Sequence, residues 1–120
     1  MLIVFRLTTG CDGTKIPEDT ENFSGFKYIS GEEAKELFDS NDPVVLLDVR
    51  NRDEYEENHI TGSILIPVDE LEERLSELPD KNTTIIVYCA AGRRSAAAVD
   101  ILVSGGYTNI YNMQSINNWP

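Results

Sequence analysis

One short segment of the sequence brings a cysteine, a glycine and two arginines together. It reads Val87-Tyr88-Cys89-Ala90-Ala91-Gly92-Arg93-Arg94-Ser95 and follows the apolar, β-branched run 83–88. The run predicts a strand that ends beside Cys89, and a helix is expected to begin at Ser95. Free amides at a helix N-terminus and neighbouring arginines both stabilise a thiolate. We therefore expect the Cys89 thiol to have a lowered pKa and to act as a nucleophile.

The residues between the cysteine and the arginines are small. Residues 90–92 are Ala, Ala and Gly, which leave room for successive backbone amides to curl around one atom and form a nest for an anion. Arg93 and Arg94 are expected to add positive charge beside this nest. The alternative is a structural cysteine before an ordinary strand-to-helix turn, because cysteine is among the most buried residue types. The arginine pair and the glycine favour the reactive thiol.

The overall charge limits the partners of the chain. Its 120 residues include 21 acidic and 10 basic side chains, and the formal net charge is −11 at pH 7. This balance argues against nucleic acid and against electrostatic docking on anionic lipid. Four of the six arginines lie in the segments 48–52 and 89–95. If the fold brings those segments together, they form a local positive site that suits a small anion.

No cofactor and no metal site is predicted from the cysteines and the histidine. Cys11 and Cys89 cannot make a disulfide framework, their spacing matches no zinc motif, and the chain has no Cys-x-x-Cys. His59 is the only histidine, and without suitably placed partners we expect it to be structural.

Apolar periodicity predicts strands and helices in alternation from residue 26 onward. Strands are expected at 26–29, 44–48, 63–66, 83–88 and 107–111. Helices are expected after the capping box 30–33, after a cap formed by Asp69 with Glu72, and at 95–104 before two glycines. A charged loop or a short helix is expected around 53–58. Continuous apolar runs are typical of strands covered on both faces, so we predict an α/β fold with a mainly parallel sheet. Asp48 and Cys89 then end two strands at the sheet edge where such folds bind ligands.

The first 25 residues differ from the rest. Residues 12–25 are polar and without periodicity, so we expect an N-terminal arm or linker at 1–25 and one domain at 26–120. Leu7-Thr8-Thr9-Gly10-Cys11 is similar to the cleavage region of a bacterial lipoprotein. A cytoplasmic location is the default expectation, and an exported lipoprotein anchored through Cys11 is the alternative. Membrane association is expected only in that second case.

Taken together, the motifs resemble the rhodanese-like sulfurtransferase family. The matching segments run in family order and cover about residues 26–119: Asp48-Val49-Arg50, Glu54-Tyr55, His59–Ser63, Ile66-Pro67, Val87–Ser95, Gly106-Tyr107, Asn112 and Trp119. The resemblance implies a three-layer α/β/α fold with a five-stranded, mainly parallel sheet. It also implies a single-domain enzyme whose catalytic cysteine carries sulfur.

By similarity, Cys89 is the expected catalytic residue of a six-residue active-site loop, and Asp48 of the nearby DVR motif helps to hold the shape of that loop. The residues expected to bind substrate are Ala90, Ala91, Gly92, Arg93, Arg94, Ser95, Asp48 and Arg50. The implied reaction moves sulfane sulfur from a small anionic donor such as thiosulfate, through a Cys89 persulfide, to a thiophilic acceptor such as cyanide, a thiol or a protein.

Two other functions fit part of the pattern. The segment 113–119 lacks the two glycines that the family commonly has there and is one residue shorter, and Thr61 stands where proline is usual. The altered segment 113–119 fits a non-catalytic protein-binding module, although Cys89 is retained, whereas Thr61 is expected to have little effect. A phosphatase or arsenate reductase would need Cys-x5-Arg, but the sixth residue after Cys89 is Ser95, and Arg94 comes one place early.

Overall fold

The computed structural model describes residues 25–40 and 42–120 of the chain. The predictions for the N-terminal arm, including a lipid-bearing Cys11, fall on residues outside this range, so the boundary at residue 25 stays a prediction. Within the described residues, no helix has both the length and the apolar character needed to span a membrane.

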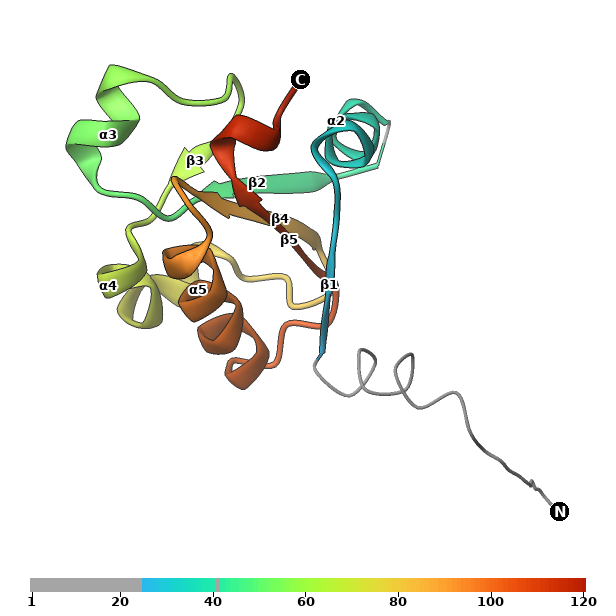
Figure 1. The fold of residues 1–120 in the computed structure, drawn as a ribbon. Helices are drawn as coiled ribbons and strands as arrows, with labels where there is room; N and C mark the ends of the chain where they lie inside the picture. The colour runs from blue at the N-terminus through green and yellow to red at the C-terminus, as the bar shows by residue number, and fades with distance from the viewer. Residues whose placement is uncertain (1–24, 41) are drawn as a thin grey trace, which may run out of the picture.

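Strands and helices alternate along the chain, as predicted (Figure 1). In order, the elements are β1 Phe26–Tyr28, α2 Gly31–Asp39, β2 Val44–Asp48, α3 Arg52–Glu57, β3 Ile64–Leu65, α4 Val68–Leu71, the 3₁₀ helix η1 Glu72–Glu77, β4 Thr84–Cys89, α5 Arg93–Ser104, β5 Ile110–Ser115 and the 3₁₀ helix η2 Ile116–Asn118.

The five strands form one sheet in the order β1-β5-β4-β2-β3, and every neighbouring pair is parallel. The predicted five-stranded parallel sheet is therefore confirmed. After β2 the chain goes on to β3 at one edge, whereas after β4 it goes on to β5 on the other side. The two connections diverge, so a crevice opens at the carboxyl ends of β2 and β4, where ligands bind in open α/β sheets. Asp48 and Cys89 are the last residues of these two strands.

The two faces of the sheet bury separate apolar cores, which gives the predicted three layers. Leu47 and Val87 pack with residues of α4 and α5 on one face, whereas Leu46 and Ile86 pack with α2 and η2 on the other. Figure 1 shows these helices on opposite sides of the sheet. Successive side chains of a strand point to opposite faces, so a strand covered on both sides must be apolar throughout.

The N-terminus of α2 lies against the end of the chain. Its capping box is present as predicted, with the Glu33 amide donating to the Ser30 hydroxyl at 3.0 Å. A Cβ added to Gly31 would lie 1.5 Å from the Asn118 carbonyl oxygen, so only glycine permits this approach. The contact fixes η2, and with it the segment that leaves β5 beside Cys89.

Two predicted helix starts were wrong. The helix expected after an Asp69 cap begins at Val68 behind Pro67, has no side-chain cap, and continues as η1 from Glu72. Pro67 is the N-cap residue and has an extended ψ of 146°. The other helix, α5, begins at Arg93 rather than at Ser95.

The last predicted strand, 107–111, lies too early, because β5 spans Ile110–Ser115. Tyr107 is instead a buried anchor in the turn before β5. Its hydroxyl donates to the Leu75 carbonyl at 3.0 Å and also contacts the Leu78 carbonyl. Its aromatic character therefore reflects packing against η1 and not strand formation.

Candidate active site

The loop after β4 wraps around the Cys89 sulfur. Sγ accepts hydrogen bonds from the Gly92 amide at 2.9 Å and from the Ser95 amide at 3.3 Å. The wrapping requires Gly92 to adopt a φ of 103°, in the left-handed region that glycine enters without strain. The Ser95 hydroxyl donates to the Gly92 carbonyl at 3.0 Å and closes the turn. The sulfur thus lies at the N-terminus of α5, in contact with free amides.

These amides change the acidity of the thiol. Burial raises the pKa of Cys89, but the amides of Ser95 and Gly92 lower it, with smaller contributions from the Ser95 hydroxyl and the Ala91 amide. Together these groups outweigh the burial, and the pKa of Cys89 lies below its ordinary value. The residue is 1% exposed and packs with the buried apolar residues of the core that α4 and α5 cover.

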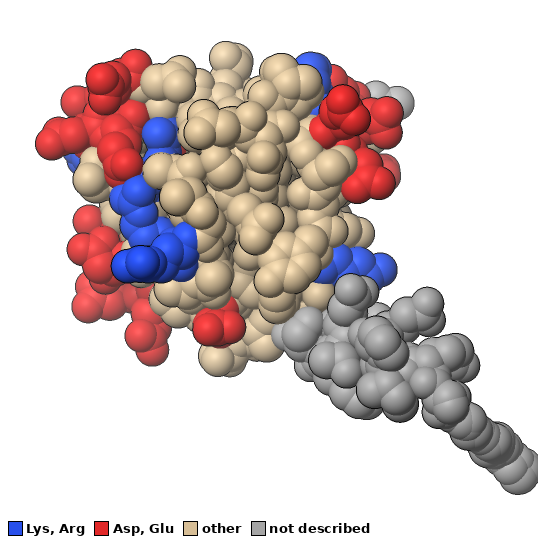
Figure 2. All heavy atoms as spheres, in the orientation of Figure 1, with Lys and Arg blue, Asp and Glu red and all other residues tan. Residues whose placement is uncertain are grey.

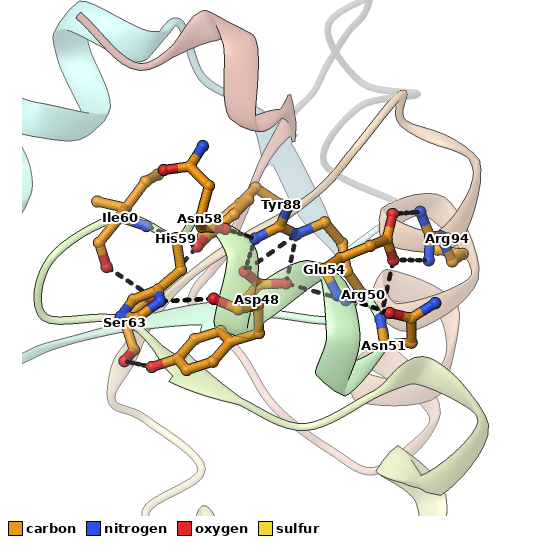
Figure 3. A network of polar contacts seen from close by, with 11 residues as sticks. Asp48, Arg50, Asn51, Glu54, Asn58, His59, Ile60, Ser63, Tyr88 and Arg94 are labelled. Carbon is orange, nitrogen blue, oxygen red and sulfur yellow. Dashed lines mark hydrogen bonds and ion pairs between the residues drawn. The ribbon is translucent and has the colours of Figure 1, made fainter.

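The two arginines of the loop have different surroundings. Arg94 forms a two-pronged ion pair with Glu54 of α3, with contacts of 2.7 and 3.0 Å (Figure 3). Arg93 is exposed, and none of the ion pairs among residues 25–40 and 42–120 involves it. The charge of Arg94 is therefore largely neutralised, whereas Arg93 keeps its charge available.

Glu54 is held in place by its own helix as well as by the arginine. It is the third helical residue of α3, and a reciprocal capping box joins it to Asn51. The hydrogen bond from Arg94 and the Asn51 amide lower the pKa of Glu54 to about 2, although partial burial opposes this. Glu54 thus remains ionised and ties α3 to the first turn of α5.

Asp48 and Arg50 form a buried ion pair with each other. Asp48 is fully buried and Arg50 is 5% exposed. The Asp48 carboxylate accepts the Arg50 amide at 2.9 Å and the guanidinium at 2.7–3.1 Å. Arg50 also donates to the carbonyl of Asn58, just after α3, at 2.6 Å. The pair anchors both the β2 turn and the far end of α3, as Figure 3 shows.

A third anchor, absent from the predicted site residues, is Tyr88 at the end of β4. Its ring is fully buried, its hydroxyl donates to the Ser63 hydroxyl at 3.1 Å, and it accepts the Ile60 amide at 3.3 Å. Burial raises the pKa of Tyr88 to about 12, so the phenol stays protonated and able to donate. Only its place next to Cys89 in the sequence gives a signal for this role.

The structure brings most of the predicted site residues together at the carboxyl edge of β2 and β4. Residues 90–95 form the loop around Cys89, while Asp48 and Arg50 brace the neighbouring connection and contact each other. His59 stacks on Tyr55 at 3.8 Å, and its Nδ1 lies 2.7 Å from the Tyr55 carbonyl oxygen. Among the described residues, no group of three or more His, Cys, Asp or Glu side chains could hold a metal ion.

The surface near this edge is mixed in charge. On the face shown in Figure 2, acidic side chains gather around α3 and α4, and basic side chains lie between them. An anion approaching this part of the strongly acidic chain therefore meets a small positive area with negative surroundings.

Comparison with known proteins agrees with this geometry. The family model for the rhodanese-like domain matches residues 30–119. The chain is 46% identical over 67 residues to the thiosulfate sulfurtransferase PspE of Escherichia coli strain K12, a match that covers 55% of this chain and 64% of PspE. It is 38% identical over 94 residues to the putative sulfur carrier protein YrkF of Bacillus subtilis strain 168, which covers 78% of this chain and 50% of YrkF. The chain thus spans less than two thirds of the length of these two relatives.

A solved structure described as rhodanese with anions from E. coli has the same fold. It superposes with a TM-score of 0.60 at 40% sequence identity, and the match covers 64% of this chain and 94% of that one. Since the family model covers most of the sequence and the whole described sheet except β1, the chain belongs to the rhodanese-like domain family.

Proposed function

We propose that the chain is a sulfurtransferase in which Cys89 takes sulfane sulfur from a small anionic donor such as thiosulfate and passes it to a thiol. The observation that carries this proposal is the pair of backbone amides, those of Gly92 and Ser95, that donate to the Cys89 sulfur at 2.9 and 3.3 Å. Amides held in this way favour an ionised sulfur, the form that attacks a sulfur–sulfur bond. The relative PspE, a thiosulfate sulfurtransferase by name, supports the choice of reaction.

In the first half-reaction, the Cys89 thiolate attacks the outer sulfur of thiosulfate. A new sulfur–sulfur bond forms to Cys89, the bond inside thiosulfate breaks, and sulfite leaves with the electron pair. Cys89 is then a persulfide, a covalent intermediate that divides one difficult transfer into two steps. No general base is required, because the attacking thiolate is already formed and the leaving anion is stable.

In the second half-reaction, the thiolate of an acceptor attacks the outer sulfur of the persulfide. The bond to Cys89 breaks, the acceptor leaves as a persulfide, and the Cys89 thiolate is restored with its electron pair. Amides of the loop stabilise the sulfur anion at the start and the end of the cycle, as an oxyanion hole stabilises oxygen. Electrons balance over the two steps without an external oxidant or reductant.

The surroundings of the sulfur suit a small donor. Cys89 is 1% exposed, so the reaction requires the donor to insert its outer sulfur into the loop. We assign the attraction of the anion to Arg93, because Glu54 already neutralises Arg94. Arg94, Asp48 and Arg50 are then supporting residues that hold the loop and α3 in place.

The geometry gives less support to a phosphatase or arsenate reductase. Such enzymes clamp two oxygens of a tetrahedral anion with the arginine that is sixth after the cysteine. Here Ser95 occupies that place and donates its hydroxyl to the Gly92 carbonyl, while both prongs of Arg94 contact Glu54. The pair of backbone amides that donate to one sulfur atom therefore favours sulfur transfer.

Mass spectrometry after treatment with thiosulfate tests the proposal. The peptide that contains Cys89 is expected to gain one sulfur, about 32 Da, and to lose it to cyanide with formation of thiocyanate. Cys89→Ala is expected to gain nothing, whereas the matched variant Cys11→Ala is expected to behave as the unaltered protein. If the folded protein acquires no sulfur at Cys89, the enzyme proposal fails and the non-catalytic binding module takes its place.

A further inference from the structure

A bulge in β5 changes which residue lies opposite Cys89. Val87 pairs with Asn112, but the next residue, Tyr88, pairs with Gln114, so Met113 is the extra residue of β5. Because of this shift, Cys89 pairs with Ser115. With an unbroken register it would instead lie opposite Gln114. Bulges often occur beside functional sites, where they re-aim one side chain.

Contacts within the bulge hold this register. Gln114 adopts a φ of 72°, a left-handed conformation that is costly for a residue other than glycine. The cost is offset in part by the buried side chain of Asn112, whose Oδ1 accepts the Gln114 amide at 2.9 Å. Asn118 Nδ2 donates to the Met113 carbonyl at 2.8 Å. Strain that is held in place by several contacts marks the bulge as a built feature of the site.

Ser115 uses its position to contact the loop that carries the chemistry. Its hydroxyl donates to the Ala90 carbonyl at 2.7 Å and accepts the Asn117 amide at 3.0 Å. Ala90 is the first residue after Cys89, so this bond fixes the start of the loop. This side-chain contact joins β5 to the loop in addition to the backbone hydrogen bonds that pair β5 with β4.

The Ala90 carbonyl and the Ala91 amide belong to one rigid peptide plane. In a trans peptide the carbonyl and the N–H point in opposite directions, so fixing one of them fixes the other. The amides that donate to the Cys89 sulfur, those of Gly92 and Ser95, follow in the same loop. A hydroxyl that holds the Ala90 carbonyl therefore fixes the first peptide plane of the loop that carries both donors.

We propose that Ser115 is a positioning residue for the sulfur chemistry: its hydroxyl anchors the Ala90 carbonyl and thereby holds the start of the loop whose Gly92 and Ser95 amides donate to Cys89 Sγ. This role rests on the proposed function of Cys89 and extends it to a residue of a different strand. Ser115 itself touches neither the sulfur donor nor the reacting sulfur. Its effect is on how readily the thiol ionises.

The pH dependence of Cys89 alkylation by iodoacetamide tests this role. The rate is followed by mass spectrometry on the Cys89 peptide, which separates it from Cys11. In Ser115→Ala the profile is expected to move to higher pH. Alkylation well below the midpoint then slows by up to about tenfold, the scale of one hydrogen bond to a charged acceptor, while the plateau at high pH stays unchanged. Ser115→Thr, which keeps the hydroxyl, is expected to restore the original profile.

Ser40→Ala is the matched control. Its hydroxyl also donates to a backbone carbonyl at 2.7 Å, that of Leu37, at the C-terminal end of α2 and thus at the opposite end from the Gly31 contact with η2. The Ser40→Ala variant is expected to lower stability without moving the pH profile of Cys89 alkylation. Ser115→Gly is a second variant without the hydroxyl, which serves if Ser115→Ala does not fold.

Two results would overturn the role of Ser115: an unchanged profile in a folded variant without its hydroxyl, or an equal displacement in Ser40→Ala. Loading of the same variants with sulfur from thiosulfate is measured separately. Alkylation requires only a thiolate, so a protein that alkylates as expected but never takes up sulfur would contradict the proposed function and leave the role of Ser115 standing.

Discussion

Asp48→Asn is expected to cause a large loss of stability, because it leaves a buried guanidinium without its counter-charge. The substitution preserves the shape of the side chain but replaces Oδ2, which accepts Arg50 Nε at 3.1 Å and Nη2 at 2.7 Å. The aspartate is 0% exposed and the arginine 5%, so water cannot replace the lost partner. Removing one member of a buried pair costs about 3–5 kcal/mol. The bonds to Oδ1 can persist, which places the expected loss near the lower end, about 3 kcal/mol.

Urea unfolding measures this loss, and a double-mutant cycle identifies its cause. If an unpaired charge is responsible, Asp48→Asn combined with Arg50→Met is expected to lose about 2 kcal/mol less than the sum of the single losses. Asp39→Asn is the matched control, since Asp39 contacts Lys35 at 2.6 Å but both side chains are about half exposed. Such a surface pair contributes less than about 1 kcal/mol. Equal losses for Asp48→Asn and Asp39→Asn, or strictly additive single losses, would refute the reasoning from burial.

Three further outcomes are expected. Glu54→Gln lowers the free energy of unfolding by about 1 kcal/mol at neutral pH, a figure reduced for the partial exposure of its pair with Arg94. Because the pKa of Glu54 is lowered from 4.5 to about 2, its contribution is complete above pH 4.5 and is lost as the pH falls toward 2. Urea midpoints of the two proteins should therefore converge as the pH falls through 2, and a difference as large at pH 2 as at neutral pH would contradict the assignment. Arg93→Ala is expected to raise the KM for thiosulfate several-fold at low salt with little change in stability, and this increase shrinks at high salt. Steady-state rates measure the KM. A KM equal to that of the unaltered protein would show that Arg93 does not attract the donor. Gly92→Ala is expected to lower stability by about 1–3 kcal/mol and to slow persulfide formation, because φ is 103° at this position. The added Cβ would lie at an ordinary 3.5 Å from Gln114, so the cost comes from the backbone conformation and not from a clash. A thermal melt and the thiosulfate reaction test this, and full sulfur loading at unchanged stability would show that the loop does not need this conformation.

The elements with strong apolar patterns could be predicted from the sequence. Val44–Asp48 and Thr84–Cys89 are central strands, and their continuous apolar character follows directly from burial on both faces. The strand Ile110–Ser115 was displaced in the prediction because it includes Asn112 and Gln114, residues that are depleted in strands or carry a polar side chain. Both residues take part in the bulge, which is held by a contact with Asn118 and by pairing with β4. A search for alternating apolar residues does not detect such contacts, because they depend on polar groups and on a distant strand.

Part of the candidate site could likewise be predicted from the sequence, and part could not. The cysteine, the small residues and the arginines lie in one segment, so a loop that binds an anion could be predicted from their order. The partner of Arg94 could not, because Glu54 lies 40 residues away and the contact depends on how α3 and α5 pack. The only local signal was the sequence Asn51-x-x-Glu54, which is a capping box and fixes where the carboxylate points. The contact from Ser115 to Ala90 likewise depends on the register of two strands.

The most direct test of the central claim is a pH titration of the Cys89 thiolate, followed by its ultraviolet absorbance. The titration of Cys89→Ser is subtracted, so that the contribution of Cys11 cancels. If backbone amides hold the sulfur as described, the midpoint for Cys89 lies below 9.0, the ordinary value for a cysteine thiol. A midpoint at or above 9.0 would mean that burial dominates and would contradict a thiolate stabilised by the loop.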